Sequence, residues 1–145
     1  YIKLLILIGT IIITSCIIHF YFIFNEKINI IITPKKEIDL VFNAKNLYNY
    51  MDSLNIKNKD IVYKQAILET GYFTSYNFRV RNNLFGFRHN KGYYIYKSWQ
   101  ESVDHYKKWQ DKRYKSGDYY EFLNKVGYAE DSLYINKLKT INFKI

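Results

Sequence analysis

The 145-residue sequence contains only one cysteine, one proline and six glycines. The single cysteine, Cys16, excludes an internal disulfide framework. The sequence has no arginine-lysine block, no zinc-ligand spacing and no nucleic-acid fold motif, so nucleic acid is not expected as a partner. A glycine-rich phosphate loop and an acidic cation-binding loop are missing as well. We therefore expect neither a nucleotide nor a metal cofactor.

Positive charge and tyrosine are abundant instead. The chain has 22 Lys and Arg against 13 Asp and Glu, a formal net charge of +9, and 16 tyrosines. This excess favours a polyanionic partner such as anionic lipid or an acidic cell-wall polymer. The same lysines also fit a compositional bias towards Lys, Ile, Asn and Tyr that needs no ligand. Charge alone does not separate the two interpretations.

An uncharged run covers residues 4–24 and consists mostly of Leu, Ile and Phe. A helix of this length spans the hydrocarbon core of a bilayer. Lys3 precedes the run, which favours an uncleaved signal anchor over residues 1–24 with the rest of the chain exported. The alternative is a lipoprotein signal, because residues 13–16 (Ile-Thr-Ser-Cys) resemble a lipobox that ends at Cys16. Both interpretations place the domain in the cell envelope, held at a membrane.

Residues 25–39 are predicted to be a linker, since Pro34 breaks any helix there, and residues 40–145 a folded domain. The apolar spacing indicates an α+β domain that is mainly helical with one very small hairpin. Residues 72–77 are expected to form a loop, and the hairpin strands are expected at 84–88 and 93–97. The helices are expected at 43–54, 58–69, 98–114, a short stretch from 118, and 131–138, with Asn43, Asn58, Ser98 and Asp118 as the candidate caps.

One carboxylate stands out at the end of an apolar helical run. Val62, Ala66, Glu69 and Phe73 share one helical face at spacings of four, three and four. A carboxylic acid among apolar neighbours loses solvation of its charged form, so its pKa rises. Such an acid can donate a proton to a leaving-group oxygen near neutral pH. A glutamate at a helix end in a solvated cleft, without chemistry, is the commoner case for this local pattern.

Four sequence blocks, in order, resemble family 73 glycoside hydrolases, the bacterial peptidoglycan β-N-acetylglucosaminidases found in autolysins and flagellar muramidase-type enzymes. The first is residues 66–71 (Ala-Ile-Leu-Glu-Thr-Gly), which is similar to the family's alanine-x-x-glutamate-serine/threonine-glycine segment. The second, residues 82–88, resembles its asparagine-asparagine-leucine-phenylalanine-glycine block. Residues 96–103 and 127–138 are similar to its glutamate-serine-valine block and its closing glycine-tyrosine-alanine block.

The resemblance implies a lysozyme-like fold, in which a helical lobe faces a small β-lobe across a sugar-binding groove. It implies that Glu69 is the catalytic acid and that Tyr128 lines the cleft beside it. Asn83 and Phe85 would shape the groove floor. Tyr72 and Tyr94 are further candidates for substrate binding in an open aromatic groove. The implied partners are peptidoglycan glycan strands, the membrane and a regulatory protein of the cell wall.

One feature departs from the two-carboxylate scheme of most glycosidases: residues 72–97 contain no Asp or Glu. The 2-acetamido oxygen of the substrate can replace the missing base, with Tyr128 orienting that group. The expected function is a membrane-anchored hydrolase that cleaves the β-1,4 bond after N-acetylglucosamine. A peptidoglycan-binding protein without turnover and a lytic transglycosylase on the same fold are the alternatives.

Overall fold

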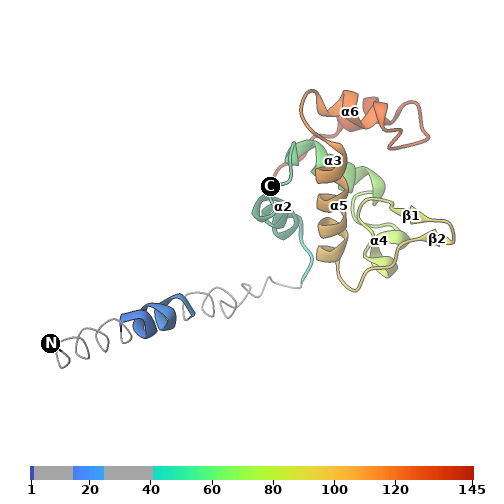
Figure 1. Ribbon diagram of the computed structural model, residues 1–145. Coiled ribbons are helices and arrows are strands. Elements are labelled where there is room, and N and C mark those ends of the chain that lie inside the picture. The colour runs from blue at the N-terminus through green and yellow to red at the C-terminus, as the bar shows by residue number, and fades with distance from the viewer. Residues whose placement is uncertain (2–14, 25–40) are drawn as a thin grey trace. The chain divides into compact units, whose positions relative to one another are not determined.

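The computed structural model describes residues 1, 15–24 and 41–145. The chain divides into two compact units, Tyr1–Ile38 and Asp39–Ile145. In the first unit residues 15–24 are helical (Figure 1), and the free thiol of Cys16 is exposed. No helix among the described residues is long and apolar enough to cross a bilayer. The predicted anchor lies largely outside the described residues, and the predicted linker lies wholly outside them.

The second unit is mainly helical with a minimal sheet, as predicted. Its two strands, β1 (Arg88–His89) and β2 (Gly92–Tyr93), are antiparallel, with Arg88 opposite Tyr93 and His89 opposite Gly92. Its helices are α2 (Ala44–Ser53), α3 (Lys59–Glu69), α4 (Tyr76–Arg81), α5 (Trp99–Arg113), α6 (Tyr119–Lys125) and α7 (Tyr134–Thr140).

Three predicted caps begin helices at the expected positions. The side chains of Asn43, Ser98 and Asp118 each accept a hydrogen bond from the backbone N–H three residues later, at 2.7, 3.4 and 2.9 Å. Glu101 also fixes the start of α5, because its carboxylate accepts the N–H of Lys97, the residue before the cap, at 2.9 Å. Asn58 also precedes a helix, but its backbone is left-handed (φ 52°) and its side chain makes no capping bond.

Two local predictions differ from the structure. The expected loop over residues 72–77 ends earlier, because the Ser75 hydroxyl accepts the Phe78 N–H at 3.2 Å and starts α4. The hairpin is shorter than the aromatic runs predict. Side-chain amides replace strand pairing at its base: Asn82 donates to the Tyr96 carbonyl at 3.0 Å.

Helix α5 lies at the centre of this unit, between α2 on one side and the hairpin on the other (Figure 1). Its buried stripe contains Trp99, Val103 and Tyr106, which are at most 3% exposed. Trp99 packs edge-on against Phe42 and Tyr50, with ring centroids 5.9 and 5.5 Å apart. This aromatic packing holds α2 and α5 together and gives the hairpin a fixed support.

Candidate functional site

Glu69 is the last residue of α3, and a tight turn follows it at once. The Thr70 hydroxyl donates to the Ala66 carbonyl at 2.5 Å and accepts the Phe73 N–H at 2.9 Å. Gly71, Tyr72 and Phe73 all have positive φ, between 54° and 63°. A buried threonine followed by glycine therefore reverses the chain directly after the carboxylate. This local geometry accounts for the glutamate-threonine-glycine order of the first block.

The second block reaches the carboxylate through Gly86. Gly86 has φ of +67°, and a Cβ atom built there would lie 2.7 Å from Glu69 Oε2. Any side chain at this position would collide with the carboxylate and would also strain the backbone. Glycine is thus required for the loop of residues 83–87 to pack directly on Glu69.

Glu69 lines a cleft of about 340 Å³. We call the residues from α3, α7 and the loop before α7 its helical wall: Leu68, Glu69, Tyr128, Ala129, Glu130, Asp131, Tyr134 and Lys137. We call the residues from the second block and the hairpin its hairpin wall: Phe85, Gly86, Arg88 and Tyr93. The cleft therefore joins three of the four blocks, which are far apart in the sequence.

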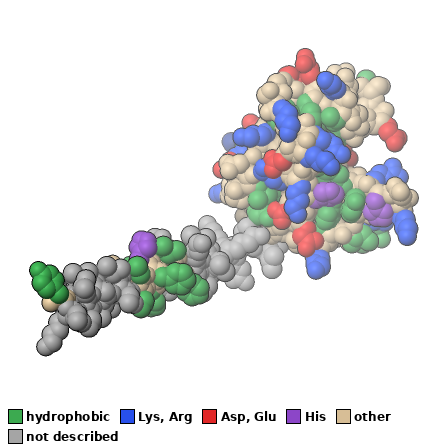
Figure 2. Space-filling model, viewed as in Figure 1, with side chains coloured by type: hydrophobic (Ala, Val, Ile, Leu, Met, Phe, Trp, Pro, Cys, Tyr) green, Lys and Arg blue, Asp and Glu red, His purple; other side chains and the backbone are tan. Residues whose placement is uncertain are grey.

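The electrostatics of the cleft favour a protonated Glu69. Burial raises the pKa of its carboxyl group from the ordinary value, and a hydrogen bond from the Tyr134 hydroxyl lowers it in part. Within the described part of the chain no cation forms an ion pair with Glu69. Lys137, which lines the same cleft, is instead paired with Asp131 at 2.6 Å. The basic side chains on the visible face of the domain are scattered among acidic ones (Figure 2).

Tyr128 fastens the closing block to the second block. Its hydroxyl donates to the Phe85 carbonyl at 3.0 Å, and its ring meets Trp109 edge-on at 5.3 Å. Burial raises the pKa of Tyr128 well above its usual value, so the phenol stays neutral. Since its proton is used in the bond to the Phe85 carbonyl, the Tyr128 hydroxyl oxygen can only accept a hydrogen bond from a substrate in the cleft.

One protein-family model matches most of the second unit. The model described as Glucosaminidase, mannosyl-glycoprotein endo-beta-N-acetylglucosaminidase, matches residues 44–144, from the first residue of α2 to past the end of α7. The chain belongs to this family. It is therefore a glycoside hydrolase of the endo-β-N-acetylglucosaminidase type, as the four blocks predicted. The comparisons with curated proteins and with solved structures gave no match.

In this glucosaminidase, Asn83 and Phe85 both support the cleft, but only Phe85 lines it. Asn83 is fully buried; its amide donates to the carbonyls of Phe87 and Tyr94 at 2.9 and 3.1 Å and its oxygen accepts the Phe87 N–H at 3.1 Å. Both N–H groups of its amide, and its oxygen, are thus bonded to backbone groups of the hairpin. Asn83 therefore fixes the base of the hairpin, and Phe85, 2% exposed, forms part of the floor of the cleft.

The structure does not bring the other two candidate tyrosines to the Glu69 cleft. Tyr72 is 69% exposed in the turn after α3, and Tyr94 packs edge-on against His89 and His105. Tyr93 lines the cleft in place of its neighbour. Adjacent residues of a strand point to opposite faces, so the sequence pattern alone did not indicate which tyrosine faces the substrate.

Sequence reasoning also missed Gly86, Arg88, Glu130 and Tyr134 as cleft residues. All four lie inside the second and closing blocks, so their positions were available as a signal. Glu130 is an exposed carboxylate that lines the same cleft as Glu69. The described part of the chain contains no cluster of three His, Cys, Asp or Glu residues that could hold a metal ion.

Proposed function

We propose that this glucosaminidase hydrolyses peptidoglycan at the β-1,4 bond after N-acetylglucosamine, with Glu69 as general acid. The observation that carries the proposal is the Glu69 carboxyl group: it lines the cleft, burial raises its pKa, and no described cation pairs with it. A carboxylic acid in that state can protonate the glycosidic oxygen as the bond to the sugar breaks. The cleft between a helical wall and a small hairpin wall is also what a lysozyme-like fold requires.

The proposed mechanism is assisted by the substrate. As the C1–O4 bond breaks, Glu69 gives its proton to O4 of the leaving sugar, and the 2-acetamido oxygen bonds to C1. Water then attacks C1, opens the resulting oxazolinium ion to the acetamide, and gives one proton to the Glu69 carboxylate. The Tyr128 hydroxyl oxygen, held by its bond to Phe85, would accept a hydrogen bond from the acetamido N–H and keep that group in line with C1.

Glu130 offers a second route for the same reaction. No carboxylate occurs in residues 72–97, but the closing block supplies Glu130 to the cleft. Its neighbour Asp131 is held by the Leu133 N–H at 2.8 Å and by Lys137, so only Glu130 is free of such bonds. As a general base it would take the proton of an attacking water directly. Glu130→Gln distinguishes the routes: about 10²-fold or greater loss supports the base, and near-full activity supports substrate assistance.

Product analysis of digested sacculi tests the reaction. We expect reducing N-acetylglucosamine ends by mass spectrometry; anhydro-muramic ends would indicate a transglycosylase, and no new ends a binding protein. Glu69→Gln should lower the rate about 10²- to 10⁴-fold while keeping sacculus binding. Glu101→Gln is the matched control, because its amide oxygen still accepts the Lys97 N–H and it lies outside the cleft. Equal loss in both variants would contradict a specific role for Glu69.

We further propose that residues 1–24 anchor the enzyme in the membrane, with the catalytic unit exported to the wall side of the envelope and open to control by a wall-associated protein. The uncharged run of residues 4–24 supports this proposal. A lipid on Cys16 is the alternative. Labelled palmitate that is incorporated into the wild type and absent from Cys16→Ser would establish the lipoprotein; membrane association without label would establish the anchor.

A further inference from the structure

A chain of buried polar side chains leads away from the cleft behind Tyr134. Gln65, Tyr106 and Gln110 are at most 1% exposed, and Tyr119 is as deeply buried. None of these residues lines the cleft, and the proposed mechanism uses none of them. Buried polar groups require partners, so each hydrogen bond along the chain can be traced.

The bonds connect α3, α5, α6 and α7 across the core. Gln110 Nε2 donates to the Tyr119 hydroxyl at 2.8 Å, and the hydroxyls of Tyr119 and Tyr106 are 2.8 Å apart. Tyr106 donates to Gln65 Oε1 at 2.5 Å, and Gln65 Nε2 donates to the Tyr134 hydroxyl at 3.2 Å. Tyr134 lines the cleft together with Glu69, and its hydroxyl lowers the pKa of the Glu69 carboxyl group in part, so these links lead from the far side of the core to the acid.

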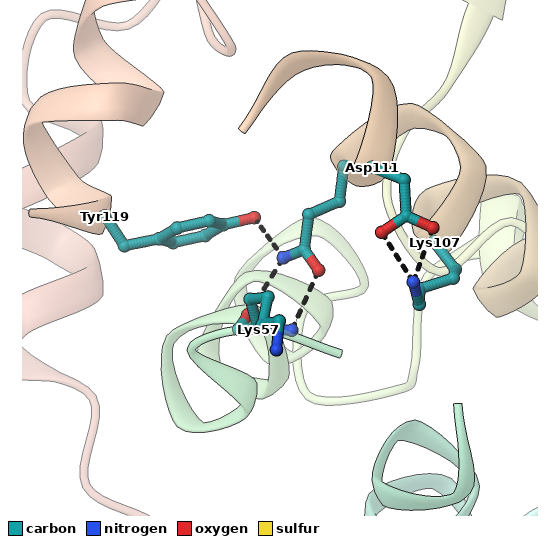
Figure 3. A network of polar contacts seen from close by, with 5 residues as sticks. Lys57, Lys107, Asp111 and Tyr119 are labelled. Carbon is teal, nitrogen blue, oxygen red and sulfur yellow. Dashed lines mark hydrogen bonds and ion pairs between the residues drawn. The ribbon is translucent and has the colours of Figure 1, made fainter. Parts of the chain in front are cut away.

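The far end of the chain is fixed by backbone. Gln110 Oε1 accepts the Lys57 N–H at 2.8 Å, and Gln110 Nε2 donates to the Lys57 carbonyl at 2.8 Å. Figure 3 shows Lys57 and Tyr119 joined by these bonds to the amide between them. A backbone N–H only donates and a carbonyl only accepts, so the Gln110 amide has one possible orientation. Its second N–H must therefore point to Tyr119.

This orientation sets the direction of every later bond. Tyr119 accepts from Gln110, so its own proton goes to Tyr106. Tyr106 in turn has its single proton left for Gln65, whose oxygen must face it. The Gln65 N–H then faces Tyr134, and the hydroxyl of Tyr134 is left to donate to Glu69.

We propose that Tyr134 is a positioning residue for the Glu69 carboxyl group, and that this one-way chain of hydrogen bonds keeps its hydroxyl proton on the Glu69 side. The inference rests on the proposed role of Glu69 as acid. The Tyr134 hydroxyl favours the charged form of Glu69 and so lowers the pKa that burial raises. The chain of hydrogen bonds therefore helps to set the pH above which Glu69 has lost its proton. The other ionisable groups that line the cleft around Glu69 are Tyr128, Glu130, Asp131 and Lys137 on the helical wall, and Arg88 and Tyr93 on the hairpin wall.

The test is the titration midpoint of the Glu69 carboxyl carbon, followed by ¹³C NMR in the full chain and assigned with Glu69→Gln. Tyr134→Phe removes the donor and should raise the midpoint by about one pH unit. Tyr106→Phe frees the Gln65 amide to turn its oxygen to Tyr134, so it should raise the midpoint in the same direction. In the Tyr134→Phe background the Tyr106 change should add nothing.

Tyr50→Phe is the matched control. Tyr50 is also buried and also donates to a side chain, Asp104 at 2.7 Å, but it lies outside the chain of bonds. It should lose stability without moving the midpoint. Should Tyr106→Phe fail to fold, Gln110→Met removes the fixed end instead and should shift the midpoint in the same direction.

An unchanged midpoint in Tyr134→Phe would overturn the proposal, and so would an equal effect of Tyr106→Phe with and without the Tyr134 hydroxyl. The midpoint needs no turnover, so this result is independent of whether Glu69 is the acid. A full sacculus-digesting rate in Glu69→Gln would instead overturn the proposed function alone. If both hold, the falling limb of kcat/KM should move to higher pH in Tyr134→Phe by the same amount as the midpoint.

Discussion

The helical wall of the cleft is braced from behind by buried hydrogen bonds, whereas the hairpin wall is buried only at Phe85, which packs on Tyr106 with ring centroids 4.3 Å apart, and is exposed at Arg88 and Tyr93. Tyr134, on the helical wall, is connected through buried hydrogen bonds to three other helices. The hairpin has two residues in each strand, and its ends are joined by the Tyr94 N–H, which donates to the Phe87 carbonyl at 3.0 Å, and by the Asn83 amide. Arg88 and Tyr93, at its tip, are exposed and stack on each other with the guanidinium 4.8 Å from the ring centroid.

This contrast matches what each wall has to do. Proton transfer requires a carboxyl group held in one place at one pKa, so its supports are buried and satisfied. Binding a polymer strand tolerates more movement, and elements with few buried contacts open most readily. The two walls meet at Gly86, the hairpin-wall residue that touches the Glu69 carboxylate. A substitution at Gly86 that disturbs the contact between the two walls is therefore expected to have the largest effect.

Gly86→Ala should have the largest effect. Its Cβ would stand 2.7 Å from Glu69 Oε2 at a φ of +67°, so either the carboxylate is displaced or the walls move apart. We expect kcat/KM on sacculi to fall by about 10²-fold, since small displacements of catalytic groups cost that much. The backbone conformation alone should cost about 1 kcal/mol of stability, measured by urea unfolding.

Gly127→Ala separates the two causes. Gly127 has a similar φ of +61° but no atom within 4 Å of a built Cβ. It should lose the same backbone stability of about 1 kcal/mol and keep most of its activity. A comparable loss of activity in both variants would mean that strain, and not contact with Glu69, explains the Gly86 result.

Asn83→Ala tests the base of the hairpin wall. The change removes three hydrogen bonds in a fully buried site and leaves the Phe87 N–H and the Tyr94 carbonyl unpaired, while the Phe87 carbonyl keeps the Tyr94 N–H. We expect a loss of about 2–4 kcal/mol in the free energy of unfolding, measured by urea denaturation. Hydrogen exchange should rise in residues 84–96 before it rises in α3. Asn124→Ala, an exposed change on α6, should stay within about 0.5 kcal/mol of the wild type.

Much of this fold could be predicted because its signals are local. The caps at Asn43, Ser98 and Asp118 act within three residues, so the sequence marks where those helices begin. Helical spacing placed Val62, Ala66 and Glu69 on one face of α3, but Phe73, predicted on the same face, lies beyond the end of the helix with a φ of 63°. Helix α4 was missed because it has six residues and buries only Phe78, which gives too little periodicity to detect.

What could not be predicted depends on packing between distant segments. Which of Tyr93 and Tyr94 faces the cleft follows from the pairing of two-residue strands, which no pattern of that length determines. The hydrogen bonds from Gln65 to Tyr134 and Tyr106 join residues 69 and 41 positions apart. Glutamines and tyrosines in helices are ordinary in sequence, and only their meeting in the core gives them a role.

Arg88→Ala tests whether the hairpin wall contributes binding more than chemistry. Arg88 lines the cleft over Tyr93, and none of the ion pairs in the described chain involves it. Removing an exposed contact to the substrate should weaken sacculus binding by about 3- to 10-fold and leave kcat nearly unchanged. Arg79→Ala, an exposed arginine on α4 outside the cleft, should change neither. A fall in kcat with unchanged binding would assign Arg88 to the chemistry instead.

The smallest effect should be the pH dependence of stability that Glu69 introduces. Its pKa is higher in the folded chain than in the unfolded one, so the folded state holds the proton more tightly. Glu69 therefore stabilises the fold least when both states are ionised, and stability should fall as pH rises from the ordinary carboxyl value through the raised one. Glu69→Gln removes this slope, so its free energy of unfolding relative to the wild type should grow between about pH 4 and neutrality. Urea unfolding of both proteins across that range measures it. A difference that shrinks as pH rises would mean that the fold favours the charged carboxylate, and the helical wall would then hold a charge and not a proton.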